Sequence, residues 1–205
     1  FDVDGTLAET ERDGHRPAFN AAFAELDLSW HWDEVLYGRL LDITGGKERI
    51  RHYAEQFDPV TAARPDFDDL VKRLHAAKTA HYVRLFEHGR LPLRPGIARL
   101  IGEARAAGLR RAIATTTSPE NVDALLRATL GEAAPGWFAV IGAGDVVPAK
   151  KPAPDIYLWV LERLGLPPAA CLAIEDSENG LKSALTAAVP CVITVGEYTR
   201  EQDFS

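Results

Sequence analysis

The sequence predicts an α/β fold: a Rossmann-like, doubly wound parallel sheet with an all-helical cap inserted into it. Two observations predict this fold. Residues 91–205 alternate short apolar runs with helical patterns, which is typical of a parallel sheet covered by helices. Residues 9–90 show helical periodicity alone, yet they directly follow an apolar run at residues 1–3. We therefore expect a core of residues 1–8 and 91–205, and a cap of residues 9–90.

The cap is expected to consist of helices, because its apolar residues recur three and four positions apart. Pro17 fits a helix only in the first turn, and Asp33 is a suitable N-cap. Gly89 is a suitable stop for the last and longest helix. The expected helices begin near Pro17, Asp33, Gly46 and Pro65.

In the core, strands and helices are expected to alternate. The expected strands are residues 111–114, 138–141, 171–174 and 191–195, and the expected helices are residues 96–107, 119–130, 155–164 and 179–187. Cys171 and Cys191 lie in two of the apolar runs. They are typical of small buried hydrophobic residues rather than of a disulfide or a metal site.

Composition restricts the classes of function. The chain carries a net charge of −7, whereas a general nucleic-acid binder usually shows a basic surface. No apolar run approaches the roughly 18 residues of a membrane-spanning helix. We therefore expect a cytoplasmic monomer whose partner is a small molecule, not nucleic acid or a membrane. The chain has no methionine and begins within an apolar run, so we expect it to lack residues at its start.

Two aspartates, Asp2 and Asp4, end the first apolar run and are followed directly by Gly5 and Thr6. In a strand, residues i and i+2 point to the same side, so both carboxylates begin on one face. Like charges raise each other's pKa unless a cation lies between them. Magnesium prefers oxygen ligands, so this stretch predicts a metal and an oxyanionic substrate such as a phosphate. The alternative is an acidic turn that only solvates a strand end.

Three further segments place polar residues at predicted strand ends or just beyond them, where ligands of open α/β sheets bind. Residues 115–118 offer hydroxyls and N–H groups before a helix, which suits phosphate. Lys150 and Lys151 precede a proline, and Glu175 and Asp176 supply two carboxylates. Each segment also has a structural explanation when taken alone. The hydroxyl run could cap a helix, the lysine pair could lie in a solvated loop, and the two carboxylates could interact with a helix dipole. Their joint occurrence at strand ends favours a phosphate site.

The four segments resemble, in order, the four motifs of the haloacid dehalogenase-like superfamily. The resemblance implies that Asp2 is a nucleophile forming an aspartyl-phosphate and that Asp4 is the general acid and base. It also implies a Mg²⁺ ion held by Asp2, by the backbone carbonyl of Asp4 and by Asp176. Glu175 would help to position the lysine or the waters on the metal. The dehalogenases of the superfamily lack the second aspartate, so its presence favours phosphoryl transfer.

The same resemblance assigns the groups that hold the phosphoryl oxygens. Thr116 resembles the phosphate-binding hydroxyl of the second motif, and Thr117 would donate its backbone N–H. Lys151, directly before the proline, resembles the lysine of the third motif, with Lys150 as its rival. Both a cation and hydroxyls at this place would stabilise the charge on the transferring group.

The cap resembles the CbbY-type branch of the superfamily, which is close to β-phosphoglucomutase. This resemblance implies a phosphatase that converts xylulose 1,5-bisphosphate to xylulose 5-phosphate and so removes an inhibitor of Rubisco. A bisphosphate needs a second anion site, which a glycine pair before a helix with nearby cations would provide. The expected substrate-binding residues of the cap are Glu11, His15, Tyr37, Gly46, Lys47 and Arg49.

Alternatives remain at this stage. His15 and Tyr37 are also typical of structural residues whose hydrogen bonds are made within the protein. The glycine pair is also typical of the plain start of a helix. Between Thr6 and His15 the chain carries one residue more than the family pattern, near Asp13 and Gly14. A β-phosphoglucomutase-type mutase, a phosphoglycolate phosphatase and a non-catalytic phosphate sensor are the competing functions.

Overall fold

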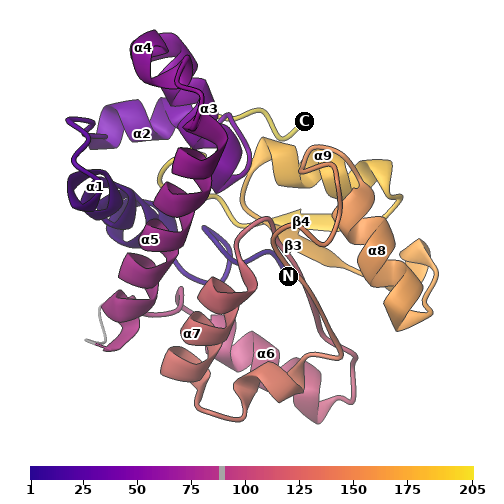
Figure 1. The fold of residues 1–205 in the computed structure, drawn as a ribbon. Helices are drawn as coiled ribbons and strands as arrows, with labels where there is room; N and C mark the ends of the chain where they lie inside the picture. Colours follow the sequence, from indigo (N-terminus) through magenta and orange to yellow (C-terminus); the bar gives the residue numbers. More distant parts are fainter. Residues whose placement is uncertain (88–90) are drawn as a thin grey trace.

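The computed structural model describes residues 1–87 and 91–205 and shows two pairs of parallel strands beside a group of helices. The α-helices are α1 (Arg16–Glu25), α2 (Glu34–Leu40), α3 (Gly46–Phe57), α4 (Pro59–Ala62), α5 (Phe67–Glu87), α6 (Ile97–Ala106), α7 (Pro119–Leu130), α8 (Asp155–Leu164) and α9 (Glu178–Thr186). The strands are β1 (Ala112–Ala114), β2 (Val140–Gly142), β3 (Ala173–Glu175) and β4 (Cys191–Ile193). In Figure 1 the helices α1–α5 lie on the left, and β3 and β4 lie on the right with α8 and α9. The predicted helix stop at Gly89 lies outside the described residues.

The sheet is assembled around the first three residues. Strand β1 pairs with β2, and β3 pairs with β4, both in parallel. Residues 1–3 run between the two pairs: the Ala114 N–H donates to the Phe1 carbonyl at 2.9 Å, and the Asp2 N–H donates to the Ile174 carbonyl at 3.0 Å. The opening run therefore belongs to the sheet, as predicted, and its backbone hydrogen bonds connect the two strand pairs. Its carboxyl end, which carries the two aspartates, is flanked by strand ends on both sides.

Helices cover both faces of the sheet, as a doubly wound fold requires. Val3 and Ile113 pack with α6 and α7 in one hydrophobic cluster. Ala114 and Ala173, on the opposite face, pack with α8 and α9 in another cluster. Because successive residues of a strand point to opposite faces, short apolar strands can serve both clusters.

The cap has a hydrophobic cluster of its own. Phe19 and Phe23 of α1 enclose Trp32, whose ring centroid lies 4.7 and 4.8 Å from theirs. Ile50 of α3 and Leu74 of α5 close the cluster. Large buried rings contribute most of the burial in such a small unit. This cluster is separate from the two clusters at the sheet.

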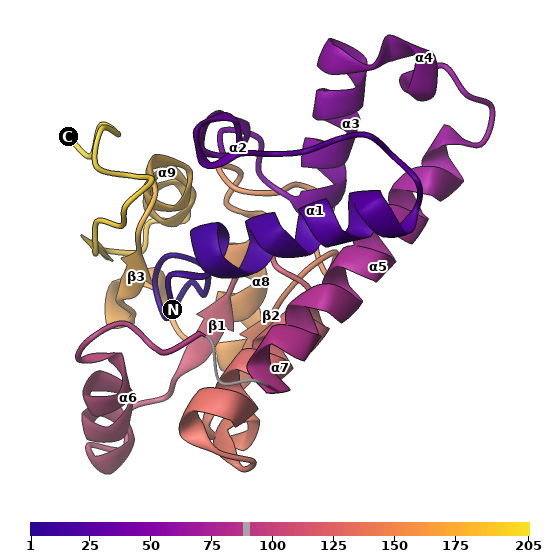
Figure 2. The ribbon, with the colours of Figure 1, turned by 90° about the vertical axis from the view of Figure 1, so that its left-hand side faces the viewer.

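Helix α5 belongs to both parts. Leu74 packs in the cap cluster, whereas Tyr82 and Phe86 pack in a cluster of the sheet. Figure 2 shows α5 running diagonally across α1, which is its main partner. The division into residues 9–90 and the remainder stays a prediction.

Element types agree with the predictions, while several bounds differ. The third expected strand, residues 171–174, begins two residues later, because a short 3-10 turn at Pro168–Ala170 precedes it. Helices α7 and α8 have the predicted bounds. Helix α4 was not predicted, since four residues are too few to show a helical period.

The position near Gly14, where one residue more than the family pattern is expected, lies in a π-helix, Glu11–His15. A π-helix widens one turn by a single residue, so it absorbs an insertion without shifting the helix that follows. Helix α1 continues directly from it at Arg16. Both Glu11 and His15 lie close to Asp4, with side-chain ligand atoms of the three residues within 4.8 Å of one another.

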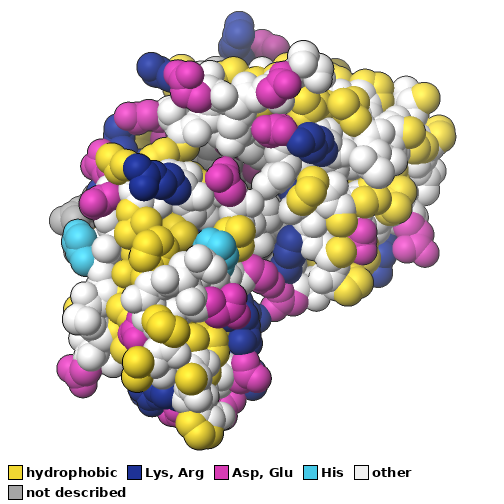
Figure 3. All heavy atoms as spheres, turned by 90° about the horizontal axis from the view of Figure 1, so that it is seen from above, with side chains coloured by type: hydrophobic (Ala, Val, Ile, Leu, Met, Phe, Trp, Pro, Cys, Tyr) yellow, Lys and Arg dark blue, Asp and Glu magenta, His cyan; other side chains and the backbone are white. Residues whose placement is uncertain are grey.

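The surface and the two cysteines indicate little about the function. No helix within residues 1–87 and 91–205 is long and apolar enough to cross a membrane. On the face shown in Figure 3, acidic and basic side chains are interspersed rather than gathered by sign. Cys171 and Cys191 are free but only partly buried, so the prediction that they are buried was too strong. Strand β4 flanks the sheet, which leaves its side chains more exposed than a central strand would.

Candidate active site

A cavity between the sheet and the cap collects most of the predicted site residues. From the core it is lined by Asp2, Asp4, Thr116, Lys151 and Asp176, and from the cap by Glu11 and Arg49. An adjoining hollow is lined by His15, Gly46 and Thr117. Tyr37 and Glu175 are fully buried, so they support the residues that line the cavity.

The opening motif turns sharply against Asp176. Gly5 adopts a φ of +82°, and a Cβ on it would lie 2.1 Å from Oδ2 of Asp176. A glycine is therefore required for this close approach and for the backbone conformation. The Thr6 hydroxyl donates to Oδ1 of Asp176 at 3.2 Å. The Gly-Thr pair thus positions the carboxylate that follows β3.

Lys151 ties three strand ends together. Its buried ammonium donates to Oδ1 of Asp2 at 2.9 Å, to Oε1 of Glu175 at 2.6 Å and to the Ala114 carbonyl at 2.9 Å. Burial by itself would lower the pKa of Lys151, but the charges of Asp2 and Glu175 raise it above its ordinary value. Lys151 therefore stays charged beside the first aspartate.

The carboxylates around Lys151 outnumber it. Oxygens of Asp2, Glu175 and Asp176 lie within 4.8 Å of one another. Burial, and then the charges of Asp2 and Glu175, raise the pKa of Asp176 well above its ordinary value. Burial raises the pKa of Glu175 to about 7 against the opposing effect of Lys151, and its Oε2 has no hydrogen-bond partner among the described residues. This excess of buried oxygen ligands fits a hard divalent cation such as Mg²⁺.

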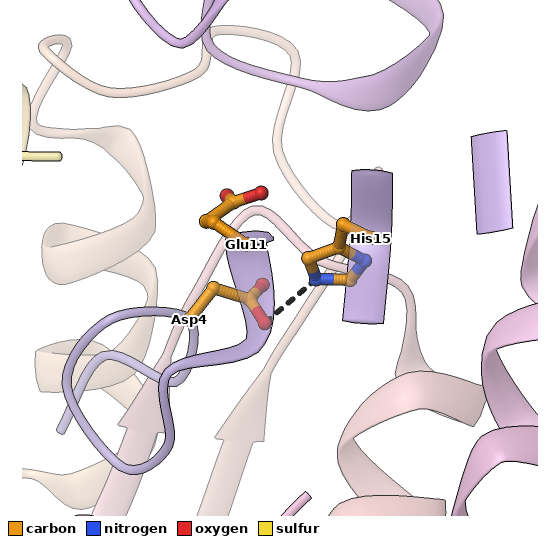
Figure 4. A group of neighbouring side chains, drawn as sticks. All are labelled: Asp4, Glu11 and His15. Carbon is orange, nitrogen blue, oxygen red and sulfur yellow. Dashed lines mark ion pairs between the residues drawn. The ribbon is translucent and has the colours of Figure 1, made fainter. Parts of the chain in front are cut away.

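Asp4 faces the cap rather than Lys151. Figure 4 shows its carboxylate pointing at the His15 ring, with Glu11 nearby. The Thr10 hydroxyl donates to Oδ1 of Asp4 at 2.5 Å, and His15 Nε2 lies 2.7 Å from the same oxygen. Burial would raise the pKa of Asp4, but His15 and Thr10 together hold it at about 2.

The other ring nitrogen of His15 also has a protein partner. Nζ of Lys78, on α5, lies 2.7 Å from His15 Nδ1. An ammonium only donates, so Nδ1 accepts and Nε2 donates to Asp4. Lys78 is itself buried, over the rings of Phe19 and Tyr82, and burial lowers its pKa to about 8. His15 was expected to bind sugar hydroxyls, but the structure commits both of its nitrogens within the protein.

The hydroxyl segment lies between β1 and α7. Thr116 lines the cavity beside Asp2. Asn121 donates to the Thr117 hydroxyl at 2.9 Å, and the Thr117 N–H is 3.4 Å from the hydroxyl of Thr115. The segment stands at the N-terminus of α7, where the helix dipole and free N–H groups favour an anion.

On the cap side, Arg49 and Glu11 are joined through Tyr37. The Tyr37 hydroxyl donates to Oε2 of Glu11 at 2.5 Å and accepts from Arg49 at 3.1 Å. Arg49 also donates to the carbonyls of Leu40 and Ile43, so it holds the connection between α2 and α3. Glu11 and Arg49 reach the cavity, whereas Tyr37 links them from behind.

The glycine-rich start of α3 lies over the hydroxyl segment. A Cβ on Gly46 would lie 2.9 Å from the His75 ring, so no side chain fits there without movement. The ammonium of Lys47 pairs with Asp145 of the core at 2.6 Å, and Lys150 pairs with the same carboxylate at 2.7 Å. Lys47 thus bridges cap and core at the edge of a separate hollow.

Sequence reasoning missed several supporting residues. Lys78 left a readable signal, since it lies four residues from both Leu74 and Tyr82 and so on the apolar face of its helix. Tyr157, which donates to Glu175, lies on the buried face of α8. Thr10 and Asn179, which donates to Thr44 of the cap at 3.1 Å, left no comparable signal.

The chain as a whole is similar to known proteins. A family model described as haloacid dehalogenase-like hydrolase matches residues 1–187. The chain therefore belongs to the haloacid dehalogenase-like hydrolase family, and it is an enzyme of the phosphatase type.

Within this family the chain falls in the CbbY-type branch. It is 55% identical over 204 residues to the plasmid-encoded protein CbbY of Cupriavidus necator, covering 100% of this chain and 80% of that one. It superposes with a TM-score of 0.92 on the crystal structure of CbbY from Rhodobacter sphaeroides in complex with phosphate, at 50% identity and covering 100% and 88% of the two chains. A mutant of that protein in complex with xylulose-1,5-bisphosphate matches with the same TM-score and coverage at 49% identity.

Proposed function

We propose that the chain is a Mg²⁺-dependent phosphatase that hydrolyses a small sugar phosphate through an aspartyl-phosphate. Its substrate would be xylulose 1,5-bisphosphate and its product xylulose 5-phosphate, which would remove an inhibitor of Rubisco. One observation carries the chemistry: a buried, charged Lys151 holds Asp2 within a cluster of three carboxylates. The similarity to a CbbY protein complexed with this bisphosphate supports the substrate.

The core residues have distinct roles in this proposal. Bound Mg²⁺, held by Asp2, the Asp4 carbonyl and Asp176, would supply a Lewis acid that neutralises phosphate charge. Asp2 attacks phosphorus, and the bond from phosphorus to the sugar oxygen breaks. Lys151 and Thr116 stabilise the charge on the transferring phosphoryl oxygens.

Asp4 moves the protons. It donates a proton to the departing sugar oxygen and then takes one from the water that attacks the aspartyl-phosphate, which releases inorganic phosphate and restores Asp2. His15 and Thr10 favour the ionised form of Asp4, which suits the second step. For the first step, a bound phosphate dianion close to Asp4 raises its pKa by like charge and so favours the protonated form.

The cap residues bind the rest of the substrate. Arg49 offers a guanidinium for the second phosphate, Glu11 accepts hydrogen bonds from sugar hydroxyls, and the N–H groups at Gly46 add donors. Tyr37 and His15 position Glu11 and Asp4 instead of reaching the sugar. We further expect a monomeric, cytoplasmic enzyme.

A substrate screen tests the proposal. Full-length protein with Mg²⁺ is assayed for phosphate release from xylulose 1,5-bisphosphate, pentose and hexose monophosphates, fructose 1,6-bisphosphate and phosphoglycolate. We expect the highest kcat/KM for xylulose 1,5-bisphosphate. A higher value for another ester would overturn the substrate. NMR of β-glucose 1-phosphate separates a mutase, which gives the 6-phosphate, from a phosphatase, which gives inorganic phosphate.

A further inference from the structure

A segment outside the four motifs forms one wall of the active-site cavity. Residues 196–202 follow β4, and five of them line the cavity together with Thr115, Thr116, Glu11 and Arg49. The members of this segment that line it are Gly196, Glu197, Tyr198, Thr199 and Gln202. A wall shared with both the catalytic aspartates and the cap is well placed to influence which substrates fit.

The base of this wall is fixed to the core. Arg94 donates to the Val195 carbonyl at 2.8 Å and also to the carbonyl of Gly5. The backbone N–H of Glu178 donates to Oε1 of Gln202 at 2.8 Å. The segment is thus held at both ends by residues next to the opening motif and the start of α9.

The outer side of the wall touches the cap. The Tyr198 ring packs edge-on against Tyr37, with ring centroids 6.1 Å apart, and Glu197 pairs with Arg12 at 2.5 Å. A Cβ added to Gly38 would lie 3.1 Å from Cδ1 of Tyr198. Gly38 therefore forms a flat seat for the tyrosine ring.

The seat lies in the middle of a helix. Gly38 is the fifth residue of α2, where glycine lowers helix stability by roughly 1 kcal/mol relative to alanine. A glycine inside a helix calls for a packing reason. The close approach of Tyr198 supplies that reason, since it is the contact that a side chain would disturb.

We propose that Tyr198 is a positioning residue that determines substrate selectivity by seating the cap, through Gly38, on the wall of residues 196–202. This inference rests on the proposed function and extends it. A substrate that spans the cavity from Asp2 to Arg49 requires the cap at a set distance from the core. A small ester that contacts only the core does not, so the seat favours two-ended sugar phosphates.

The test compares two substrates across matched variants of the full-length protein. One is the best sugar bisphosphate of the screen, and the other is p-nitrophenyl phosphate, which has no second phosphate for Arg49 to bind. For Tyr198→Ala we expect KM for the bisphosphate to rise about tenfold, with kcat/KM for p-nitrophenyl phosphate within about twofold of wild type. Tyr198→Phe keeps the ring and should restore the wild-type KM. Arg200→Ala, an exposed change on the same segment, serves as the control.

Gly38→Ala supplies the second arm. It should raise KM for the bisphosphate in the wild-type background. It should cause no further rise when Tyr198 is already alanine, because the effects of substitutions at contacting residues are not additive. Additive effects, or an equal loss on both substrates in Tyr198→Ala, would overturn the inference. Loss in Tyr198→Phe equal to that in Tyr198→Ala would also overturn it, since the hydroxyl would then be responsible. The proposed function fails independently, on wild-type protein, if no sugar bisphosphate is hydrolysed.

Discussion

The two halves of the active site balance their charges differently. In the core, Asp2, Glu175 and Asp176 share a single ammonium, that of Lys151, and the pKa of Asp176 is raised. In the cap, Glu11 and Arg49 are matched through the Tyr37 hydroxyl. The core half therefore carries an excess of negative charge that a bound cation would balance, whereas the cap half is satisfied by itself.

The difference predicts that chemistry and selectivity are separable in this protein. Core groups lie at the ends of parallel strands, whose backbone hydrogen bonds hold them in place. Cap groups must exchange protein partners for substrate, so only the difference between the two sets of hydrogen bonds contributes to binding. Changes in the core should therefore abolish turnover, and changes in the cap should shift KM.

The largest effect is expected from Asp2→Asn. The amide keeps the size of the side chain but is no nucleophile, so turnover should fall about a thousandfold or more. Phosphate release at saturating substrate measures this loss. Asp69→Asn, an exposed change on α5, should behave as wild type. Retained activity in Asp2→Asn would refute the nucleophile and remove the basis for separating the two halves.

Arg49→Lys tests the cap half. It keeps the charge but loses the guanidinium fork that reaches Tyr37, Leu40 and Ile43. We expect KM for the bisphosphate to rise about tenfold to a hundredfold, with p-nitrophenyl phosphate hydrolysis little changed. Steady-state kinetics on both substrates gives the answer. An equal fall in kcat on both would mean that the cap contributes directly to the chemistry.

Metal and pH should affect stability through the core half. Burial raises the pKa of Glu175 from 4.5 to about 7, so the folded, metal-free protein binds one more proton than the unfolded chain between those values. The contribution of Glu175 to the free energy of unfolding should therefore be greatest below pH 4.5. It should fall by about 1.4 kcal/mol per pH unit as the pH rises from 4.5 to about 7. The Asp4 carboxyl, with a pKa of about 2, acts only at lower pH and with the opposite sign.

Thermal unfolding with EDTA and with Mg²⁺, at several pH values in this window, measures the effect. Mg²⁺ should raise the melting temperature most at the high-pH end, because it stabilises the ionised carboxylates. Glu175→Gln removes one of the two carboxyls whose pKa is raised and should weaken the dependence in EDTA, while Asp176 still contributes with the same sign. A melting temperature that does not change on addition of Mg²⁺ at any of these pH values would contradict a cation site in the core half.

The smallest effect is expected from Lys47→Ala. Its ion pair with Asp145 is exposed, and such pairs contribute about 1 kcal/mol or less. We expect KM to change by about twofold. Asp145→Asn should have an effect at least as large, because it breaks the ion pairs of both Lys47 and Lys150. A tenfold rise in KM in Lys47→Ala alone would instead make Lys47 a substrate ligand, as the sequence resemblance implies.

Much of the core could be predicted because its signals are local. Each motif follows an apolar run and precedes a helix, and strand ends meet at one edge of a parallel sheet. Lys151 was distinguished from Lys150 by the proline that follows it, and the structure places its ammonium on Asp2. The cap was harder to predict, since helical periodicity shows which face of a helix is buried but not which partner it meets.

The sequence by itself determined the reaction centre: the residue types at the strand ends, their order, and the helical insertion after the first strand. Only the tertiary structure decided the pairings across long separations. Lys78 meets His15 over 63 residues because α5 crosses α1, and Tyr198 meets Gly38 because the chain returns from β4 to the cap. Such contacts depend on how whole helices pack, and no local preference of the chain encodes them.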